Sequence, residues 1–274
     1  MTIRSSRADR HGLTLIELVL VLVILVVLAS MVVPRFDFLK NQADHASAAK
    51  TAAELTALLQ SYRTQNKAYP LFDLLVDTTG TPYAKVYTDG ATAPLSAFSV
   101  PNSTATNSYY QSIVSGGLLY GWRHAAAATD ASDSATSMVN MKAEAAAGTL
   151  KLASITGAGT YNGYSIFNTI YPGVAFDSSN QPVPVTLPVT AAPTGVELIA
   201  VGIGPRSGMA GYSMTNVPLE TDLDDPTQNY CRYIAIFAIY ASGKPAQLKM
   251  VVDHKFRQIG QRIEQFKQVG EQGN

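Results

Sequence analysis

The sequence predicts an α+β protein in which a long N-terminal helix crosses a membrane and continues as the spine of a globular domain with an antiparallel β-sheet. Two observations predict this fold class. A nearly unbroken apolar run at residues 13–33 leads into helical spacing up to residue 69. Beyond it, segments rich in β-branched and aromatic residues alternate with turn-forming residues. With 274 residues and 47% hydrophobic composition, the chain is long enough to bury a core.

The basic leader at residues 1–12 sets the orientation of the helix that follows. It carries Arg4, Arg7 and Arg10 against Asp9, and positive charge beside a first apolar helix keeps that end in the cytoplasm. The apolar run is long enough for a helix of roughly 30 Å, which spans a bilayer. We therefore expect a single-pass membrane protein with its N-terminus in the cytoplasm and the remainder of the chain outside.

Two residues distinguish this segment from an ordinary export signal. Glu17 lies within the apolar run, where an unpaired carboxylate is costly and calls for a partner. Gly12 closes the leader directly before the run, whereas a secretory signal peptide has its small residues after the apolar stretch. An ordinary signal anchor, or a signal peptide cut after Ala29, is the alternative interpretation.

The segment Gly12–Leu18 resembles the N-terminal signature of type IV prepilins and type II secretion pseudopilins. The resemblance implies that a prepilin peptidase cuts after Gly12, that Leu13 becomes an N-methylated terminus, and that Glu17 pairs with a neighbouring subunit's amine. Leu13 departs from the family's usual phenylalanine. Pro34 stands where the family has its helix-bending proline, and a proline removes the hydrogen bond to residue 30.

The spine helix is expected to continue outside the membrane over residues 35–69. Leu55, Leu58, Leu59 and Tyr62 share the spacing of one buried helical face. Tyr69 precedes Pro70, and a residue before proline is disfavoured in a helix, so the helix ends there. The organisation predicted is a leader at 1–12, a transmembrane and assembly helix at 13–34, its amphipathic continuation at 35–69, and a periplasmic or extracellular globular domain at 70–274.

The globular domain is expected to contain a sheet, exposed loops and a C-terminal helix. Turn-forming residues indicate loops over 88–117 and 125–137, around a short strand at 118–123. A further set of β-rich segments predicts strands at 150–155, 164–170, 196–203, 230–240 and 248–252. Residues 241–245 form the turn between the last two strands. Apolar residues at helical spacing predict a helix over 253–269, with Asp253 as its N-cap.

Candidate chemical sites are few. Asp222, Asp224 and Asp225 offer the hard oxygen ligands that calcium prefers, although no calcium-loop pattern surrounds them and a solvated turn is the alternative. The lone Cys231 is expected to be a buried structural thiol. Gly202 and Gly204 lack the spacing of a nucleotide-binding loop and indicate a turn after a strand.

The composition and the resemblance together favour a non-enzymatic structural subunit. Charged residues make up 15% of the chain, against about 25% on average, which is typical of an exported surface protein. The 20 basic and 20 acidic residues cancel, so nucleic-acid binding is not indicated. The resemblance implies a subunit of a type IV pilus or a type II secretion pseudopilus, with other pilin-like subunits, a prepilin peptidase and an inner-membrane assembly platform as partners.

Two alternatives to this interpretation stay open. The first is a minor pilin whose loops bind a surface, a secreted ligand or DNA, for which an aromatic and basic patch of Tyr109, Tyr110, Trp122 and Arg123 is the candidate. The second is a membrane-anchored periplasmic protein of another function. With 274 residues, the chain is longer than the usual major subunit of such systems, so the resemblance implies a minor or larger subunit.

Overall fold

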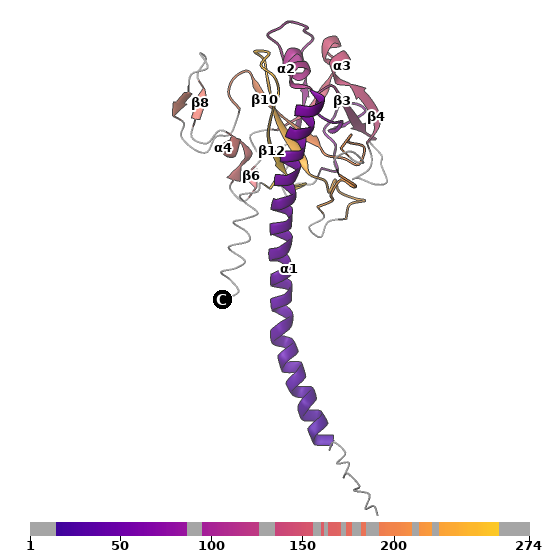
Figure 1. Cartoon of the computed structure of the whole chain (residues 1–274), viewed down its shortest axis with the longest axis vertical. Coiled ribbons are helices and arrows are strands. Elements are labelled where there is room, and N and C mark those ends of the chain that lie inside the picture. The colour runs from indigo at the N-terminus through magenta and orange to yellow at the C-terminus, as the bar shows by residue number, and fades with distance from the viewer. Residues whose placement is uncertain are drawn as a thin grey trace, which may run out of the picture.

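The computed structural model describes residues 15–86, 95–125, 135–155, 160–161, 164–170, 174–176, 182–184, 192–209, 214–220 and 225–257. One helix, α1 (Leu15–Asn66), runs from the N-terminal end into the globular part of the molecule. Figure 1 shows its upper part lying against the strands and its lower part extending well beyond them along a gentle curve. α1 is continuous through Pro34, and it ends where Lys67 adopts the left-handed region at φ 58°.

The other elements follow α1 in a mixed order of strands and short helices. They are β1 (Phe72–Asp77), β2 (Leu95–Ser99), α2 (Tyr109–Gly116), β3 (Tyr120–His124), β4 (Ala135–Asn140), α3 (Met141–Ala147), β5 (Lys151–Ile155), β6 (Thr160–Tyr161), β7 (Tyr164–Ser165), α4 (Ile166–Ile170), β8 (Val174–Phe176), β9 (Pro182–Pro184), β10 (Val196–Gly202), β11 (Ile234–Tyr240) and β12 (Gln247–Val252). The α+β class is therefore confirmed.

An eight-stranded sheet forms the body of the globular part. Its main path runs β12-β11-β10-β1-β3-β4, while β5 pairs with both β10 and β2. β10 pairs with β11 over its whole length, from Val196 opposite Tyr240 to Gly202 opposite Ile234. An antiparallel sheet was predicted, but the observed sheet is mixed, because β1 and β3 are parallel. Parallel neighbours need a long crossover, and the intervening chain, which holds β2 and α2, supplies it.

The core lies between α1 and the sheet. β11 is buried on both faces, as its uninterrupted apolar sequence predicts. Leu55 and Leu59 of α1 are almost fully buried, while Leu58 and Tyr62 pack against the same cluster, so the predicted apolar face is confirmed. The ring of Phe237 lies edge-on to Phe72, with their centroids 5.5 Å apart.

Several predicted boundaries are wrong. The segment predicted as a strand at 164–170 has only the two residues of β7 in strand conformation and continues as α4. Its short apolar run fits either structure, which periodicity alone cannot decide. The predicted loops at 88–117 and 125–137 contain β2, α2 and the start of β4. α2 has a signal in the sequence, since Ser108 caps its first turn and Gly117 ends it in the left-handed region.

The chain after β12 does not begin a helix at Asp253. Oδ1 of Asp253 accepts hydrogen bonds from the backbone N–H groups of Lys255 and Arg257, as an N-cap would, but Phe256 then takes a left-handed φ of 59°. The side chain of Arg257 returns to Asp253 in a buried ion pair of 2.6 Å. The segment 253–257 is thus a turn held by the hydrogen bonds and ion pair of Asp253. The rest of the helix predicted to residue 269 lies outside the described residues.

Within the part of the chain that the structure describes, no helix is both long enough and apolar enough to cross a membrane.

Candidate assembly site

The N-terminal part of α1 exposes apolar side chains in every direction. Leu15 and Ile16 are 83% and 76% exposed, and the large apolar residues from Leu18 to Leu28 are all about half exposed. A helix that is apolar around its whole circumference needs an apolar environment, because burying each such side chain is worth about 1.5–3 kcal/mol. An exposed apolar surface of this extent marks a site of interaction with another chain or a lipid phase.

Glu17 is the acidic residue in the first turn of this segment. A carboxylate there is favoured by the positive end of the helix dipole. The spacing from residue 13 to residue 17 is one helical turn, which brings residues to the same face of a helix. Gly12 and Leu13, the predicted cleavage and methylation sites, lie outside the described residues, so the pairing of the new terminus with Glu17 stays a prediction.

Of the three aspartates predicted as calcium ligands, the structure describes Asp225. Oδ1 of Asp225 accepts hydrogen bonds from the backbone N–H and hydroxyl of Thr227, at 2.9 and 2.7 Å, and these bonds lower the pKa of the carboxyl. Asp222 and Asp224 lie outside the described residues. Among the residues that are described, no group of three His, Cys, Asp or Glu side chains could hold a metal ion. Calcium binding stays a prediction.

The four residues of the predicted binding patch lie in regular elements and not in exposed loops. Tyr109 and Tyr110 begin α2, and the ring of Tyr109 packs edge-on against Phe98 at 5.2 Å. Trp122 and Arg123 are neighbours on β3, so their side chains point to opposite faces of the sheet. The four residues therefore do not form one loop patch. Tyr109 and Tyr110, predicted in a loop, lie in a helix, while Trp122 and Arg123 lie in the strand predicted at 118–123.

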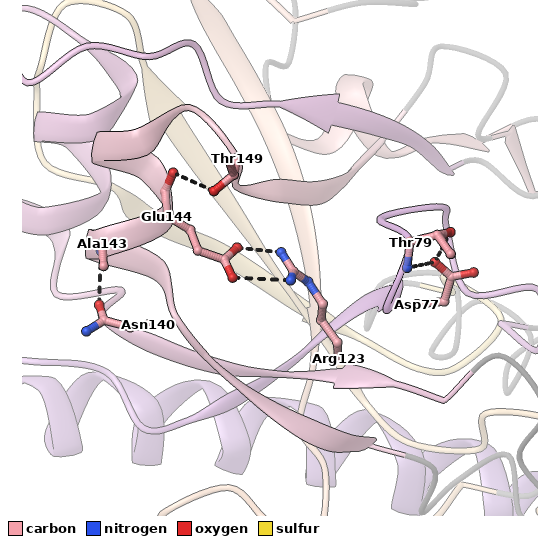
Figure 2. A network of polar contacts seen from close by, with 7 residues as sticks. All are labelled: Asp77, Thr79, Arg123, Asn140, Ala143, Glu144 and Thr149. Carbon is pink, nitrogen blue, oxygen red and sulfur yellow. Dashed lines mark hydrogen bonds and ion pairs between the residues drawn. The ribbon is translucent and has the colours of Figure 1, made fainter.

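Arg123 takes part in a polar network beneath α3. Its guanidinium nitrogens contact both carboxylate oxygens of Glu144, at 3.2 and 2.5 Å. Figure 2 shows this fork between β3 and α3, with Asn140 capping the first turn of α3 through the N–H of Ala143. A two-point arginine–carboxylate contact fixes geometry as well as charge, so it holds α3 on the face of the β3–β4 pair.

A buried polar centre at the middle of the sheet was not predicted from the sequence. The hydroxyl of Tyr230 donates to Oδ2 of Asp73 at 2.8 Å, and both residues are almost fully buried. His124 stacks on Tyr83 with ring centroids 4.1 Å apart and meets Tyr230 edge-on at 5.4 Å. Burial lowers the pKa of His124 to about 4. Burial and the Asp73 charge raise the pKa of Tyr230, so its hydroxyl keeps the donated proton.

Two glycines make room for this centre. A Cβ at Gly202 would lie 1.8 Å from the Tyr230 hydroxyl, and a Cβ at Gly204 would lie 1.9 Å from Oδ2 of Asp73. Both distances are far inside van der Waals contact. The two glycines, one the last residue of β10 and the other two positions beyond it, therefore have a packing role. They were the one signal in the sequence that could have pointed to the polar centre. Cys231, beside Tyr230, is buried as predicted.

Comparison with known proteins bears on the apolar segment. Residues 7–33 match the family model described as the prokaryotic N-terminal methylation motif. The chain carries a prepilin-type N-terminus. The motif spans Gly12, Leu13 and Glu17 together with the exposed apolar part of α1, so the predicted resemblance to type IV pilins and pseudopilins is confirmed.

The relatives that the chain resembles in sequence include several proteins named type II secretion system core protein G. The protein of Aeromonas hydrophila is 38% identical over 90 residues, which cover 31% of this chain and 63% of that protein. The Klebsiella pneumoniae protein is 34% identical over 86 residues, which cover 30% of this chain and 61% of that protein. The chain thus spans about three fifths of the length of these relatives. No solved structure matches the chain.

Proposed function

We propose that the chain is a structural subunit of a type II secretion pseudopilus or a related type IV pilus, assembled through the N-terminal part of α1. The observation that carries the proposal is the coincidence of the methylation motif with a helix segment exposed and apolar on all sides. Such a segment is stable only where lipid or other apolar helices cover it, because exposing its side chains to water costs free energy. The similarity to type II secretion system core proteins G favours the secretion pseudopilus.

Maturation is the first step of the proposed mechanism. A prepilin peptidase cuts between Gly12 and Leu13, which removes the basic leader and creates an α-amine at Leu13. Until assembly, the apolar part of α1 holds the chain in the inner membrane with its globular part on the periplasmic side. Other pilin-like subunits and an inner-membrane assembly platform are the proposed partners, which the resemblance to type IV pilins and pseudopilins supports.

The second step is registration of neighbouring subunits by Glu17. In a bundle of α1 helices, the carboxylate of Glu17 is attracted to the α-amine of a neighbour through an interior of low dielectric constant. An unpaired charge there is costly, so only the axial offset that joins the two groups is stable. Close packing of the apolar side chains then holds the helices together, and the charge pair selects the register.

Intact-mass spectrometry of the protein purified from its native membrane tests the maturation step. The proposal predicts a chain that begins at Leu13 and is one methyl group heavier than its sequence. A chain that begins at Met1, or after Ala29, would contradict it. Replacement of Gly12 by a bulky residue, Gly12→Ile, is expected to leave the leader attached. Replacement of Ser5, within the leader but away from the cut, is the matched control and should mature normally.

A further inference from the structure

An open hollow of about 590 Å³ lies at the C-terminal end of α1, where the helix meets α2. Figure 1 shows this end of α1 at the top of the globular part, opposite the end that carries the methylation motif. The hollow is lined by Gln60, Arg63, Thr64, Lys67, Tyr69 and Ser115. Its volume falls within the range of about 300–1,000 Å³ that small-molecule sites occupy.

The charge in the lining has one sign. Arg63 and Lys67 are both cationic, and no lining residue is acidic. The ends of α1 and α2 each contribute the negative pole of a helix dipole, equivalent to roughly half a charge. Arg63 offsets part of this negative potential, because it donates from Nε to the carbonyl of Gly116 at 2.9 Å and from Nη2 to the carbonyl of Ser115 at 3.5 Å. Two full cations outweigh what remains, so the hollow favours an anion.

The cations are held differently. The guanidinium of Arg63 lies 5.3 Å from the centre of the Tyr69 ring, which fixes its plane at the wall of the hollow. Besides its contacts to the carbonyls of Gly116 and Ser115, the guanidinium has further N–H groups on Nη1 and Nη2 that can bind a carboxylate. Lys67 is exposed on the turn that ends α1, so its ammonium can approach a bound anion from the solvent side.

The neutral residues add hydrogen-bond acceptors. The hydroxyl of Thr64 donates to the carbonyl of Gln60 at 2.9 Å, and that of Ser115 donates to the carbonyl of Gln111 at 2.6 Å. Because each proton is directed to its own helix, the two hydroxyl oxygens present lone pairs to other donors. The hydroxyl groups of a sugar can donate hydrogen bonds to these two oxygens. The amide of Gln60 can serve either role.

We propose that this hollow binds a sugar acid, with its carboxylate held between Arg63 and Lys67 and its hydroxyl groups directed to Thr64 and Ser115. The site goes beyond the structural role of the chain, and it does not depend on assembly into a filament. The shared chemistry of its ligand is a uronic acid, which a free monosaccharide or a residue of an acidic polysaccharide can supply.

Calorimetric titration of the full chain in detergent micelles tests the proposal with two sugars that differ in one group. Galacturonate carries the carboxylate and galactose does not. We expect galacturonate to bind at least about tenfold more tightly than galactose, because a charge-assisted hydrogen bond is worth that much or more. The binding of galacturonate should weaken as salt is raised. Equal binding of the two sugars, or no detectable binding of galacturonate, would overturn the proposal.

Variants assign the site to this hollow. Lys67→Gln removes one cation without removing a buried side chain, and it is expected to weaken galacturonate binding about tenfold or more. Lys142→Gln removes an exposed lysine of α3 that does not line the hollow and should leave binding unchanged. An unaffected Lys67→Gln variant with an unchanged melting temperature would contradict the assignment. An oligogalacturonate arm separates the sources: tighter binding than the monomer identifies a polysaccharide ligand, and equal binding per residue identifies the free acid.

Discussion

The two ends of α1 have opposite environments although one helix contains both. From Leu15 to Leu28 the large apolar side chains are all exposed, whereas Leu55 and Leu59, further along, are 2% and 0% exposed. The second region is amphipathic and buries one face on the sheet. The first is apolar on every face and has no sheet beside it. A helix with both patterns has one region that stabilises its own domain and another that requires copies of the chain or lipid.

This difference in burial determines which substitutions act on folding and which act on assembly. Loss of apolar volume in the buried region leaves a cavity inside the domain. The same loss of apolar volume in the exposed region changes side chains that do not pack in the domain core, so it creates no cavity there.

The largest expected effect is that of Leu59→Ala. Leu59 is fully buried in the core, so truncation should lower the free energy of unfolding by about 2–5 kcal/mol. Leu22→Ala, the same change at a side chain that is 53% exposed, should leave the domain's unfolding transition unchanged. Denaturant titration followed by tryptophan fluorescence measures both. Equal losses from the two variants would erase the distinction between the regions.

The polar centre should make the stability of the globular part depend on pH. His124 is fully buried between Tyr83 and Tyr230, and burial lowers its pKa to about 4. The unfolded histidine gains a proton below about pH 6.5, while the folded one stays neutral until near pH 4. Stability contributed by neutral His124 is thus complete above pH 6.5 and decreases as the pH falls, by up to about 3 kcal/mol at pH 4.

The matched variant for this prediction is His124→Phe, which keeps a flat ring on Tyr83 and removes the titration. Melting temperatures of both proteins between pH 4 and pH 7 are compared, because carboxylates contribute to both curves alike. The variant should lose less stability than the unsubstituted protein as the pH falls. Parallel curves would show that His124 is not the group responsible.

A smaller effect is expected at the ion pair between Arg123 and Glu144. The pair is half-buried, with side-chain exposures of 16% and 28%, and its two-point geometry favours an interaction of about 1 kcal/mol. A double-mutant cycle with Arg123→Ala and Glu144→Ala isolates that coupling from the effect of each truncation. A coupling indistinguishable from zero would mean that α3 is held on the sheet by packing alone.

The sequence predicted the parts of the fold in which local pattern and burial agree. The apolar face from Leu55 to Tyr62, the doubly buried β11 and the turn before β12 all follow from periodicity and turn residues. β1 was not predicted, because its pairing depends on β3 and β10, which are distant in sequence. It also bends at Leu75, which has a φ of 51° that its residue type disfavours.

The candidate sites also differ in whether their residues are close together in the sequence. The motif at Gly12–Leu18 is local in sequence, so reading the residues in order was enough to find it. The polar centre unites Asp73, His124 and Tyr230 from three separate segments, and only the folded sheet brings them together. The basic hollow likewise combines the end of α1 with Ser115 of α2, which lay in a predicted loop.

Glu17 has no expected role in the stability of the globular domain, but it is the residue proposed to set the register of neighbouring subunits. Glu17→Ala should leave membrane insertion and the unfolding transition intact and remove efficient incorporation into filaments, because the register-setting charge pair is lost. Glu54→Ala is the matched control, since Glu54 is an exposed glutamate on the same helix. The deciding measurement is the fraction of each variant in sheared filaments relative to the membrane pool. We predict a large decrease for Glu17→Ala alone, and normal incorporation of that variant would contradict assembly through the N-terminal part of α1 with Glu17 as its register.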